Sequence, residues 1–165
     1  MIKNKKGFTL IEIIVVVVIL AVLMAVAVPS VLKYLDEADD AKYMAQARAA
    51  YTIMKTEITK ALVNDSDGIL DASDIHNVLA NCDFSNMPKI IGVATDVNIV
   101  SGSTETITKN NIPNVYYLQF GTIDVSGGSP VVNAERFATI KENEIVNISK
   151  NAPENVYFVT VNYDG

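Results

Sequence analysis

Residues 5–16 read KKGFTLIEIIVV and open the one long apolar run of the chain. Between Phe8 and Val28, only Thr9 and Glu12 are polar. A helix of about 20 apolar residues is long enough to cross the hydrocarbon core of a bilayer, which is roughly 30 Å thick. The sequence therefore predicts a membrane-spanning helix over residues 8–28, and the glutamate inside it requires an explanation.

The charges beside this segment predict its orientation. Three lysines precede it: Lys3, Lys5 and Lys6. Basic residues next to a span stay in the cytoplasm, so we expect the rest of the chain to lie outside it. Without these three lysines, the 13 Lys and Arg fall to 10, against 19 Asp and Glu, and the net charge is −9. So acidic a chain is not expected to bind nucleic acid, because binding phosphates requires clustered basic residues.

Length and cysteine content bound the architecture. At 165 residues, the chain is long enough for one globular domain with its own core in addition to an anchor. Its mean hydropathy of +0.25 is raised mainly by residues 8–28. Cys82 is the sole cysteine, which excludes an intrachain disulfide and a cysteine-based zinc cluster. We interpret it as a small, partly buried apolar residue.

Three interpretations of the apolar segment compete. The first is a cleaved secretory signal, with Ala25-Val26-Ala27 as a small-x-small cleavage site. The second is a plain, uncleaved membrane anchor. Neither explains Glu12, because an ionisable side chain in an apolar helix costs a few kcal/mol on insertion and by default indicates a functional partner. The third interpretation gives Glu12 a function in assembly.

The string Lys5-Lys6-Gly7-Phe8-Thr9-Leu10-Ile11-Glu12 resembles the class III signal of type IV pilins and pseudopilins. The resemblance covers about the first third of the chain. It implies that a membrane aspartyl protease, the prepilin peptidase, cleaves after Gly7 and that the new terminal Phe8 is N-methylated. It also implies that Glu12 is the glutamate used in assembly, and that Pro29 is a helix-kinking proline near the far end of the span.

Physical chemistry is consistent with a pairing of Phe8 and Glu12. Cleavage after Gly7 exposes an ammonium group at Phe8, and methylation preserves its positive charge. The two residues lie about 6 Å apart along one helix, so copies staggered by a few residues place Glu12 of one beside Phe8 of the next. Such a pair is far stronger in a low dielectric than in water, whereas an unpaired Glu12 keeps its desolvation cost.

The helical pattern continues beyond Pro29. Apolar or small residues recur every three or four positions through residues 31–62, which predicts an amphipathic helix continuous with the span. From Phe8 to Leu62 this helix would extend about 80 Å. We interpret the acidic residues at 36–40 as solvated or paired with basic residues of a neighbouring subunit. The basic residues considered for that pairing are Lys33, Lys42 and Arg48.

Residues 64–68 read NDSDG and predict a turn. With the aspartates that follow, they partly imitate a calcium-binding loop. The weak candidate ligands are Asp65, Asp67, Asp71 and Asp74. Aligned on Gly68, however, the first ligand position falls on Val63, and the last ligand would be aspartate rather than glutamate. We therefore expect a structural loop and no metal.

The C-terminal half consists of short runs rich in Val, Ile, Tyr and Phe, separated by Gly, Asn, Ser and Pro, which is typical of strands. The predicted strands are 89–94, 97–100, 115–120, 137–141, 145–148 and 156–163. In the last of them, Tyr157, Val159, Val161 and Tyr163 should share one face. Before the strands we predict a short helix with Asp71 or Ser73 as its N-cap and His76 on its surface.

The predicted fold is α+β, with a long N-terminal α-helix, membrane-spanning in its first half, packed on a C-terminal antiparallel β-sheet. This is the type IV pilin-like architecture that the resemblance implies. The predicted segments are a leader peptide (1–7), a transmembrane and assembly helix (8–28), the amphipathic second half of the helix (29–62) and a globular head (63–165). Many Gram-negative pilins close a C-terminal loop with a disulfide that this chain cannot form, which is compatible with a Gram-positive source.

The resemblance implies a structural subunit of a type IV pilus used for adhesion, twitching motility or aggregation. The implied partners are further copies in a helical filament, minor pilins, the prepilin peptidase, the assembly platform with its ATPase, and the cytoplasmic membrane before assembly. Two alternatives stay open: a pseudopilin of a type II secretion or DNA-uptake system, and a tethered or secreted binding domain that does not polymerise. Without a phosphate loop, a His or Cys ligand pair or a Gly-x-Ser-x-Gly motif, neither a cofactor nor enzymatic activity is expected.

Overall fold

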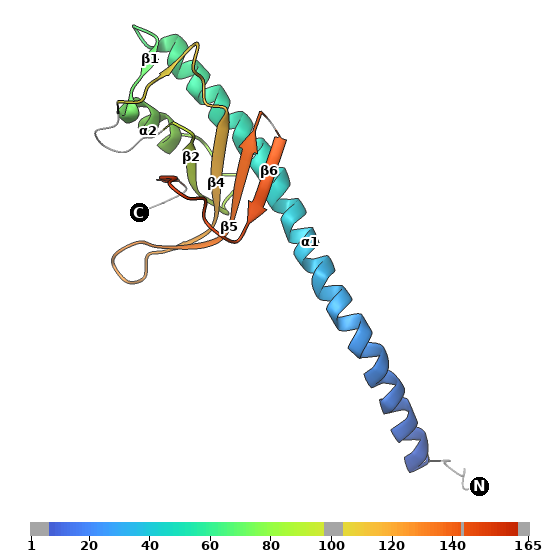
Figure 1. The fold of residues 1–165 in the computed structure, drawn as a ribbon. Coiled ribbons are helices and arrows are strands. Elements are labelled where there is room, and N and C mark those ends of the chain that lie inside the picture. The colour runs from blue at the N-terminus through green and yellow to red at the C-terminus, as the bar shows by residue number, and fades with distance from the viewer. Residues whose placement is uncertain (1–6, 98–103, 143, 162–165) are drawn as a thin grey trace, which may run out of the picture. The chain divides into compact units, whose positions relative to one another are not determined.

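The computed structural model describes residues 7–97, 104–142 and 144–161. Within these ranges it contains two helices and seven strands (Figure 1). Contacts between residues divide the chain into two compact units, Met1–Asp40 and Ala41–Gly165. The second unit, called the head below, contains the C-terminal part of the long helix and every described strand.

Helix α1, Leu10–Asn64, is 55 residues long and is shared by the two units. Its bounds lie within two residues of the predicted range, so the prediction of one continuous helix is confirmed. Pro29 lies inside α1, where its nitrogen has no hydrogen to donate to the carbonyl four residues earlier. The kink expected at Pro29 stays a prediction. Among the described residues, α1 is the one helix long and apolar enough to cross a membrane.

A five-stranded antiparallel sheet forms the centre of the head, in the order β6-β5-β4-β2-β7. Its strands are β2 (Ile90–Thr95), β4 (Val115–Asp124), β5 (Val131–Lys141), β6 (Glu144–Ser149) and β7 (Val159–Thr160). A separate two-stranded sheet pairs β1 (Ile69–Leu70) with β3 (Ile107–Thr108). The predicted α+β class with an antiparallel sheet is therefore confirmed.

The part of α1 in the head packs on the sheet through a stripe of buried residues at helical spacing. The stripe consists of Ala47, Ala50, Tyr51, Met54, Ile58 and Leu62. It belongs to one core with Tyr116, Leu118 and Phe120, which alternate along β4 and are fully buried. The rings of Tyr51 and Tyr116 meet edge to face with their centroids 4.9 Å apart. Each large apolar side chain buried here contributes about 1.5–3 kcal/mol, so packing holds the helix on the sheet.

The C-terminal segment packs on β2 and β5. Every residue of β2 is buried, as expected for a short and continuous apolar run. Phe158, which precedes β7, packs against Phe137 of β5 with ring centroids 5.8 Å apart. A Cβ atom on Gly92 of β2 would lie 3.2 Å from the Cβ of Phe158, so glycine at this position allows the close approach. Packing of Phe158 therefore helps to hold the C-terminal segment on the sheet.

A β-bulge interrupts the pairing of β4 with β5. Phe120 pairs with Arg136, whereas the next residue, Gly121, pairs with Ala134. Glu135 is therefore the extra residue of the bulge. A bulge turns the side chains of its strand out of their regular alternation and bends the strand.

The bulge allows two consecutive side chains of β5 to reach the same residue of α1. The Tyr43 hydroxyl donates to Glu135 Oε2 at 2.8 Å, and the Arg136 guanidinium lies 6.0 Å from the centre of the Tyr43 ring. In a regular strand, neighbouring side chains point to opposite faces. Lys89 Nζ also donates to Glu135 Oε1 at 2.9 Å. Glu135 thus links α1, β5 and the residue before β2.

Helix α2, Ala72–Ala80, begins at the predicted N-cap, Asp71. Asp71 Oδ1 accepts from the amides of Ser73 and Asp74 at 2.8 and 2.9 Å, and Asp74 Oδ2 accepts from the Asp71 amide at 3.1 Å. This reciprocal arrangement is a capping box. His76 is exposed on α2, as predicted.

Several strand bounds differ from the prediction. β4 and β5 are longer than expected, because residues 121–124 and 131–134 pair with each other as a hairpin that continues past the bulge. β1 and β3 were not predicted, since two residues each are too few to show an alternating pattern. Of the predicted strand 97–100, Val97 lies in a bend and the rest falls outside the described residues.

The prediction for the last strand, 156–163, is largely wrong. Of the described residues in this range, β7 contains only Val159 and Thr160, which pair with Val93 and Gly92 of β2. The Val161 amide adds one further bond to β2, to the Ile91 carbonyl at 3.1 Å. Tyr157 is 59% exposed instead of sharing the buried face of Val159. A left-handed residue, Asn155 with φ 57°, ends the extended backbone on the N-terminal side. Val161 is buried like Val159, which agrees with the common face predicted for these two residues, and Tyr163 lies outside the described residues.

Candidate functional site

Helix α1 starts with a capping box made by Thr9 and Glu12. The Thr9 amide and hydroxyl both donate to Glu12 Oε2, at 2.7 and 2.9 Å, and the Glu12 amide donates to Thr9 Oγ1 at 3.4 Å. Thr-x-x-Glu ahead of an apolar run is a known signal for a helix start. The spacing of Thr9 and Glu12 is therefore the sequence signal for this capping function, which Glu12 has in addition to the assembly function expected from the resemblance.

This capping box leaves the residues before it outside the helix. Gly7, Phe8 and Thr9 are not helical and are exposed, Phe8 to 83%. An exposed, non-helical peptide bond is the kind that proteases reach most readily. The structure therefore leaves the bond between Gly7 and Phe8 accessible. The three lysines expected to orient the segment, Lys3, Lys5 and Lys6, lie outside the described residues.

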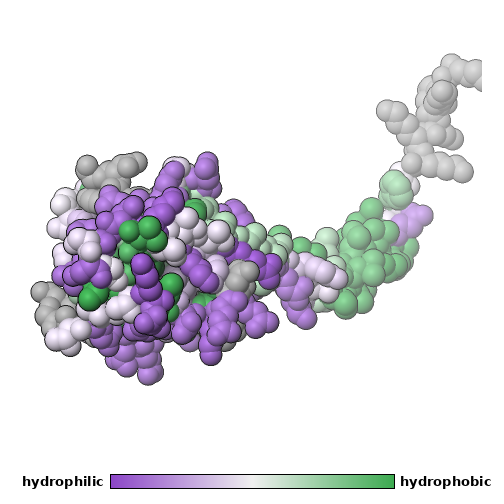
Figure 2. All heavy atoms as spheres, turned by 90° about the horizontal axis from the view of Figure 1, so that it is seen from above, coloured by the Kyte–Doolittle hydropathy of each residue, from purple (hydrophilic) through white to green (hydrophobic). Residues whose placement is uncertain are grey.

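The N-terminal part of α1 presents a continuous hydrophobic surface (Figure 2). All residues from 8 to 28 are exposed in the isolated chain, and Glu12 is the one charged residue among them. An apolar surface this large requires a lipid bilayer or partner helices to cover it. Because both Thr9 bonds use Oε2, and a carboxylate has about four lone-pair sites, Glu12 can cap its own helix and also accept an ammonium group from a second chain.

The acidic residues that follow the span are placed on the surface of α1. Asp36, Glu37 and Asp39 are exposed, and Asp40 is partly buried. Lys33 Nζ lies 3.7 Å from Glu37 Oε1, with both side chains more than half exposed. Such an exposed pair contributes about 0–1 kcal/mol, so it stabilises α1 only slightly.

The four aspartates considered as calcium ligands accept hydrogen bonds from backbone amides. Asp65 Oδ2 accepts from the amides of residues 67–69 at 3.0–3.3 Å, and Asp67 Oδ1 accepts from an amide in the same turn at 2.9 Å. Hydrogen bonding with Asp67 lowers the pKa of Asp65. Asp71 and Asp74 form the capping box of α2. Within the described ranges, no three His, Cys, Asp or Glu side chains lie together in a way that could hold a metal ion.

Cys82 is a free thiol, 7% exposed, and its Sγ donates to the Val78 carbonyl at 3.4 Å. Burial, with a smaller contribution from the charge of Glu57, raises the pKa of this thiol to about 12. Since the thiolate is the reactive form, Cys82 is inert near neutral pH. Cys82 belongs to the buried core, so it is more fully buried than the partly buried apolar residue expected from the sequence.

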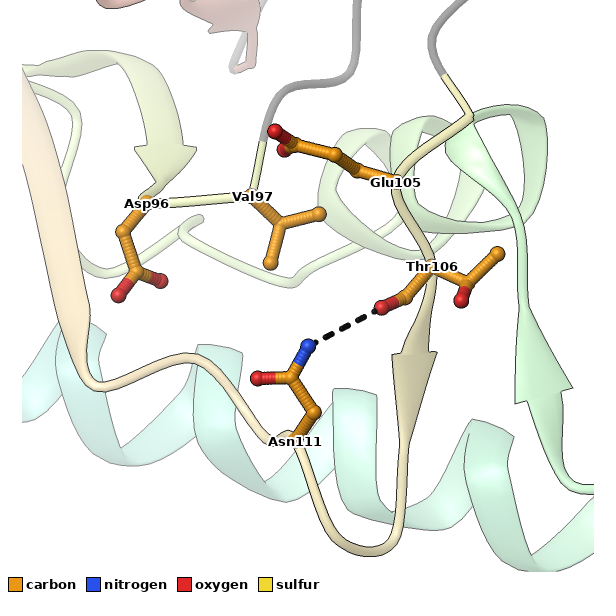
Figure 3. Close-up of a pocket in the computed structure, with 5 residues that line it drawn as sticks. All are labelled: Asp96, Val97, Glu105, Thr106 and Asn111. Carbon is orange, nitrogen blue, oxygen red and sulfur yellow. Dashed lines mark hydrogen bonds between the residues drawn. The ribbon is translucent and has the colours of Figure 1, made fainter.

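A hollow of about 390 Å³ lies where the chain leaves β2 and where it enters β3 (Figure 3). It is lined by Asp96, Val97, Glu105, Thr106 and Asn111. The Asn111 side-chain amide donates to the Thr106 carbonyl at 3.5 Å, and Asp96 Oδ2 accepts from the amides of residues 114 and 115 at 3.3 Å each. Because these described lining residues include no nucleophile next to a base, the hollow supports no catalytic assignment.

Residues 2–28 match a family model described as the prokaryotic N-terminal methylation motif. Comparisons with curated proteins and with solved structures gave no match. The matched range contains Gly7, Phe8, Thr9, Glu12 and the exposed apolar segment, so the motif points to a structural protein anchored in a membrane rather than to an enzyme. The N-terminal segment of this chain is therefore a class III prepilin signal, of the kind that type IV pilins and pseudopilins carry.

Proposed function

We propose that the chain is a pilin, a structural subunit that polymerises through residues 8–28 into a type IV pilus on the cell surface. The observation that carries this proposal is the prepilin signal at the start of an exposed apolar helix whose C-terminal part packs on a folded head. The folded head can be exposed to water, whereas the apolar residues 8–28 must be covered by lipid or by other helices.

The proposed pathway begins in the cytoplasmic membrane, with Lys3, Lys5 and Lys6 inside the cell and the head outside. Prepilin peptidase cuts the exposed bond after Gly7 and methylates Phe8. An ATPase-driven platform then moves the subunit from lipid into a core of like helices. Lipid tails are about as apolar as leucine, so this transfer changes the burial of residues 8–28 little, and close packing and polar pairs select the assembled state.

Glu12 is the polar group proposed to set the register of the filament. In the membrane, its bonds to Thr9 partly replace the lost contacts with water. In the filament, its carboxylate would also accept a hydrogen bond from the methylated ammonium group of Phe8 in a neighbouring subunit. An unpaired Glu12 charge in the core of a filament would be strongly unfavourable, so a subunit docked in a wrong register would dissociate.

The first experiment is the intact mass and N-terminal residue of the protein recovered from cells. The proposal expects a chain that begins at N-methylated Phe8. A chain that begins at Val28 would instead establish an ordinary secreted domain, and a chain that retains residues 1–7 in cells with active prepilin peptidase would contradict processing.

A second experiment separates the two functions of Glu12. Glu12→Gln keeps a hydrogen-bonding group for the capping box but removes the charge, whereas Thr9→Ala removes the cap and keeps the charge. We expect Glu12→Gln to be processed but to yield no sheared fibres, and Thr9→Ala to yield fibres at a reduced level. Normal fibres from Glu12→Gln would contradict the charge pairing.

A pseudopilin shares the same N-terminus, so the motif supports that alternative equally. Mechanical shearing of cells separates the two. Long fibres that contain this subunit indicate a pilus. Processed subunits that never appear in the sheared fraction, although other pili of the same cells do, would favour a pseudopilin or a tethered domain.

A further inference from the structure

Charge is distributed unevenly between two parts of the head. Residues 41–64, the part of α1 in the head, carry four basic residues and one acidic residue, a net charge of +3. Residues 65–165 carry five basic and 13 acidic residues, a net charge of −8. The outer surface of this helix is therefore basic, although the head as a whole is acidic.

The basic residues of α1 flank a stripe of small side chains on the face that points away from the core. We call the exposed residues Lys42, Arg48, Lys55 and Lys60 the basic face. At 100° per residue, Arg48 and Lys55 lie on one edge of the stripe and the other two on the opposite edge. The small residues between them, also exposed, are Ala45, Ala49, Thr52 and Thr56.

Because the side chains of this stripe are small, another chain can approach the backbone of α1 closely. The hydroxyls of Thr52 and Thr56 donate to the backbone carbonyls four residues earlier, at 3.1 and 2.7 Å. A shallow groove of about 390 Å³ runs beside them and is lined in part by Tyr51, Lys55 and Lys60. Lys60 is paired with Glu57 at 2.7 Å, which leaves a positive excess toward Arg48 and Lys55.

An acidic stretch follows the basic face along the chain. The acidic loop, residues 65–74, carries four aspartates and no basic residue. Backbone amides fix the orientation of Asp65 and Asp67, and hydrogen bonding lowers the pKa of Asp65, so this carboxylate stays ionised. Lys109 lies beside Gly68 and reduces the negative charge of the loop without cancelling it.

We propose that the basic face of one copy receives the acidic loop of a neighbouring copy displaced along the α1 axis. Two copies side by side without displacement would place basic face against basic face and acidic loop against acidic loop. Lys55 lies 9 residues before the end of α1, and Arg48 lies 16 residues before it. A displacement of roughly 15–25 Å along the helix axis therefore brings unlike charges together.

Such a contact joins two different surfaces of the same chain. Contacts of this kind do not close into a symmetric pair and can continue into an open helical fibre. A second copy fits the basic face better than a nucleic acid does, because the net charge of the head repels polyanions while the acidic loop is carried by every subunit. The inference rests on the proposed pilin function and adds the surface through which the heads meet.

Cross-linking tests the contact directly. Because the native Cys82 is buried, cysteines introduced at exposed positions are the ones that react. Arg48→Cys and Lys55→Cys, each combined with Ser66→Cys, should give a ladder of covalent multimers when sheared fibres are treated with a short bismaleimide. Lys150→Cys with Ser66→Cys is the control and should give no more multimers than Ser66→Cys alone. Fibres in which neither test pair forms multimers above the control would overturn the proposal.

Charge reversal gives an independent readout. Arg48→Glu with Lys55→Glu should lower the yield of sheared fibres at least tenfold relative to Lys141→Glu with Lys150→Glu, an equal change of net charge at exposed positions. Adding Ser66→Lys, at an exposed position of the acidic loop, to the first variant should partly restore the fibres. Equal yields from the two double variants, or no restoration, would refute this contact while wild-type fibres still support the proposed function. Processed wild-type subunits that form no fibres would instead contradict the proposed function itself.

Discussion

Gly121 is the position in the head where we expect an added methyl group to be least tolerated. A Cβ atom there would overlap the Asn133 carbonyl oxygen and would lie 2.9 Å from the Asn133 carbonyl carbon and 3.0 Å from Ala134 Cα. All three are backbone atoms of β5, so no side chain can rotate to make room. Gly121 has no positive φ, so the effect of Gly121→Ala comes from space and not from backbone conformation.

The Cβ atom and the carbonyl oxygen would have to separate by well over 1 Å to reach an ordinary van der Waals distance, which pushes β4 and β5 apart at the bulge. Overpacking of this kind costs about 1–3 kcal/mol. The Gly121 amide also donates to the Lys89 carbonyl at 2.8 Å, and losing one such bond costs about 1 kcal/mol more. We therefore expect Gly121→Ala to lower the free energy of unfolding by about 2–4 kcal/mol, or the Tm by roughly 5–15 °C.

The assay is urea and thermal unfolding of the full chain in detergent micelles, followed by near-ultraviolet circular dichroism. Gly127→Ala is the matched control, because a Cβ atom at Gly127 meets nothing within 4 Å and Gly127 has no positive φ. It should leave the stability unchanged or raise it by about 0.4–1 kcal/mol. If Gly121→Ala stays within 0.5 kcal/mol of the wild type, or if both variants lose equal stability, the reasoning from the bulge is refuted.

Three further outcomes are expected. Hydrogen bonding to Lys89 and Tyr43 holds the pKa of Glu135 below its ordinary value of 4.5. The ionised carboxylate therefore contributes fully to the free energy of unfolding above pH 4.5, and this contribution is lost as the pH falls through the lowered pKa. Glu135→Gln should accordingly cost about 0.5–1 kcal/mol at pH 7 and nothing in strong acid, measured by urea unfolding at several pH values; an equal cost at every pH would contradict this. Cys82 should react with iodoacetamide at pH 8 at least about tenfold more slowly in the folded chain than in urea, because its raised pKa leaves little thiolate. Asp71→Ala should lower the free energy of unfolding by about 1 kcal/mol through loss of the α2 cap, whereas Ser66→Ala, at an exposed position in the preceding loop, should change it by less than about 0.5 kcal/mol.

The accuracy of the sequence predictions depended on how local each feature is. The bounds of α1 and the N-cap of α2 were predicted well, because helix periodicity and capping involve residues three or four positions apart. The alternation of apolar residues at 156–163 predicts a longer strand than β7, which has two residues, because a strand also requires a partner and residues 156–158 are not paired with β2. The Thr9–Glu12 capping box was missed, although its spacing is visible in the sequence.

Local sequence is sufficient to predict the N-terminal signal, the apolar segment and the long helix, since each depends on contiguous residues or on a single helical period. Long-range contacts in the folded chain establish the strand order, the bulge at Gly121 and the packing of Phe158 against β2. The contact of Tyr43 with Glu135 shows the reason, because these residues are 92 positions apart and meet only through a bulge that no local pattern announces. Contacts of this range depend on which strands pair and in which register, and many registers satisfy the same alternation of apolar residues.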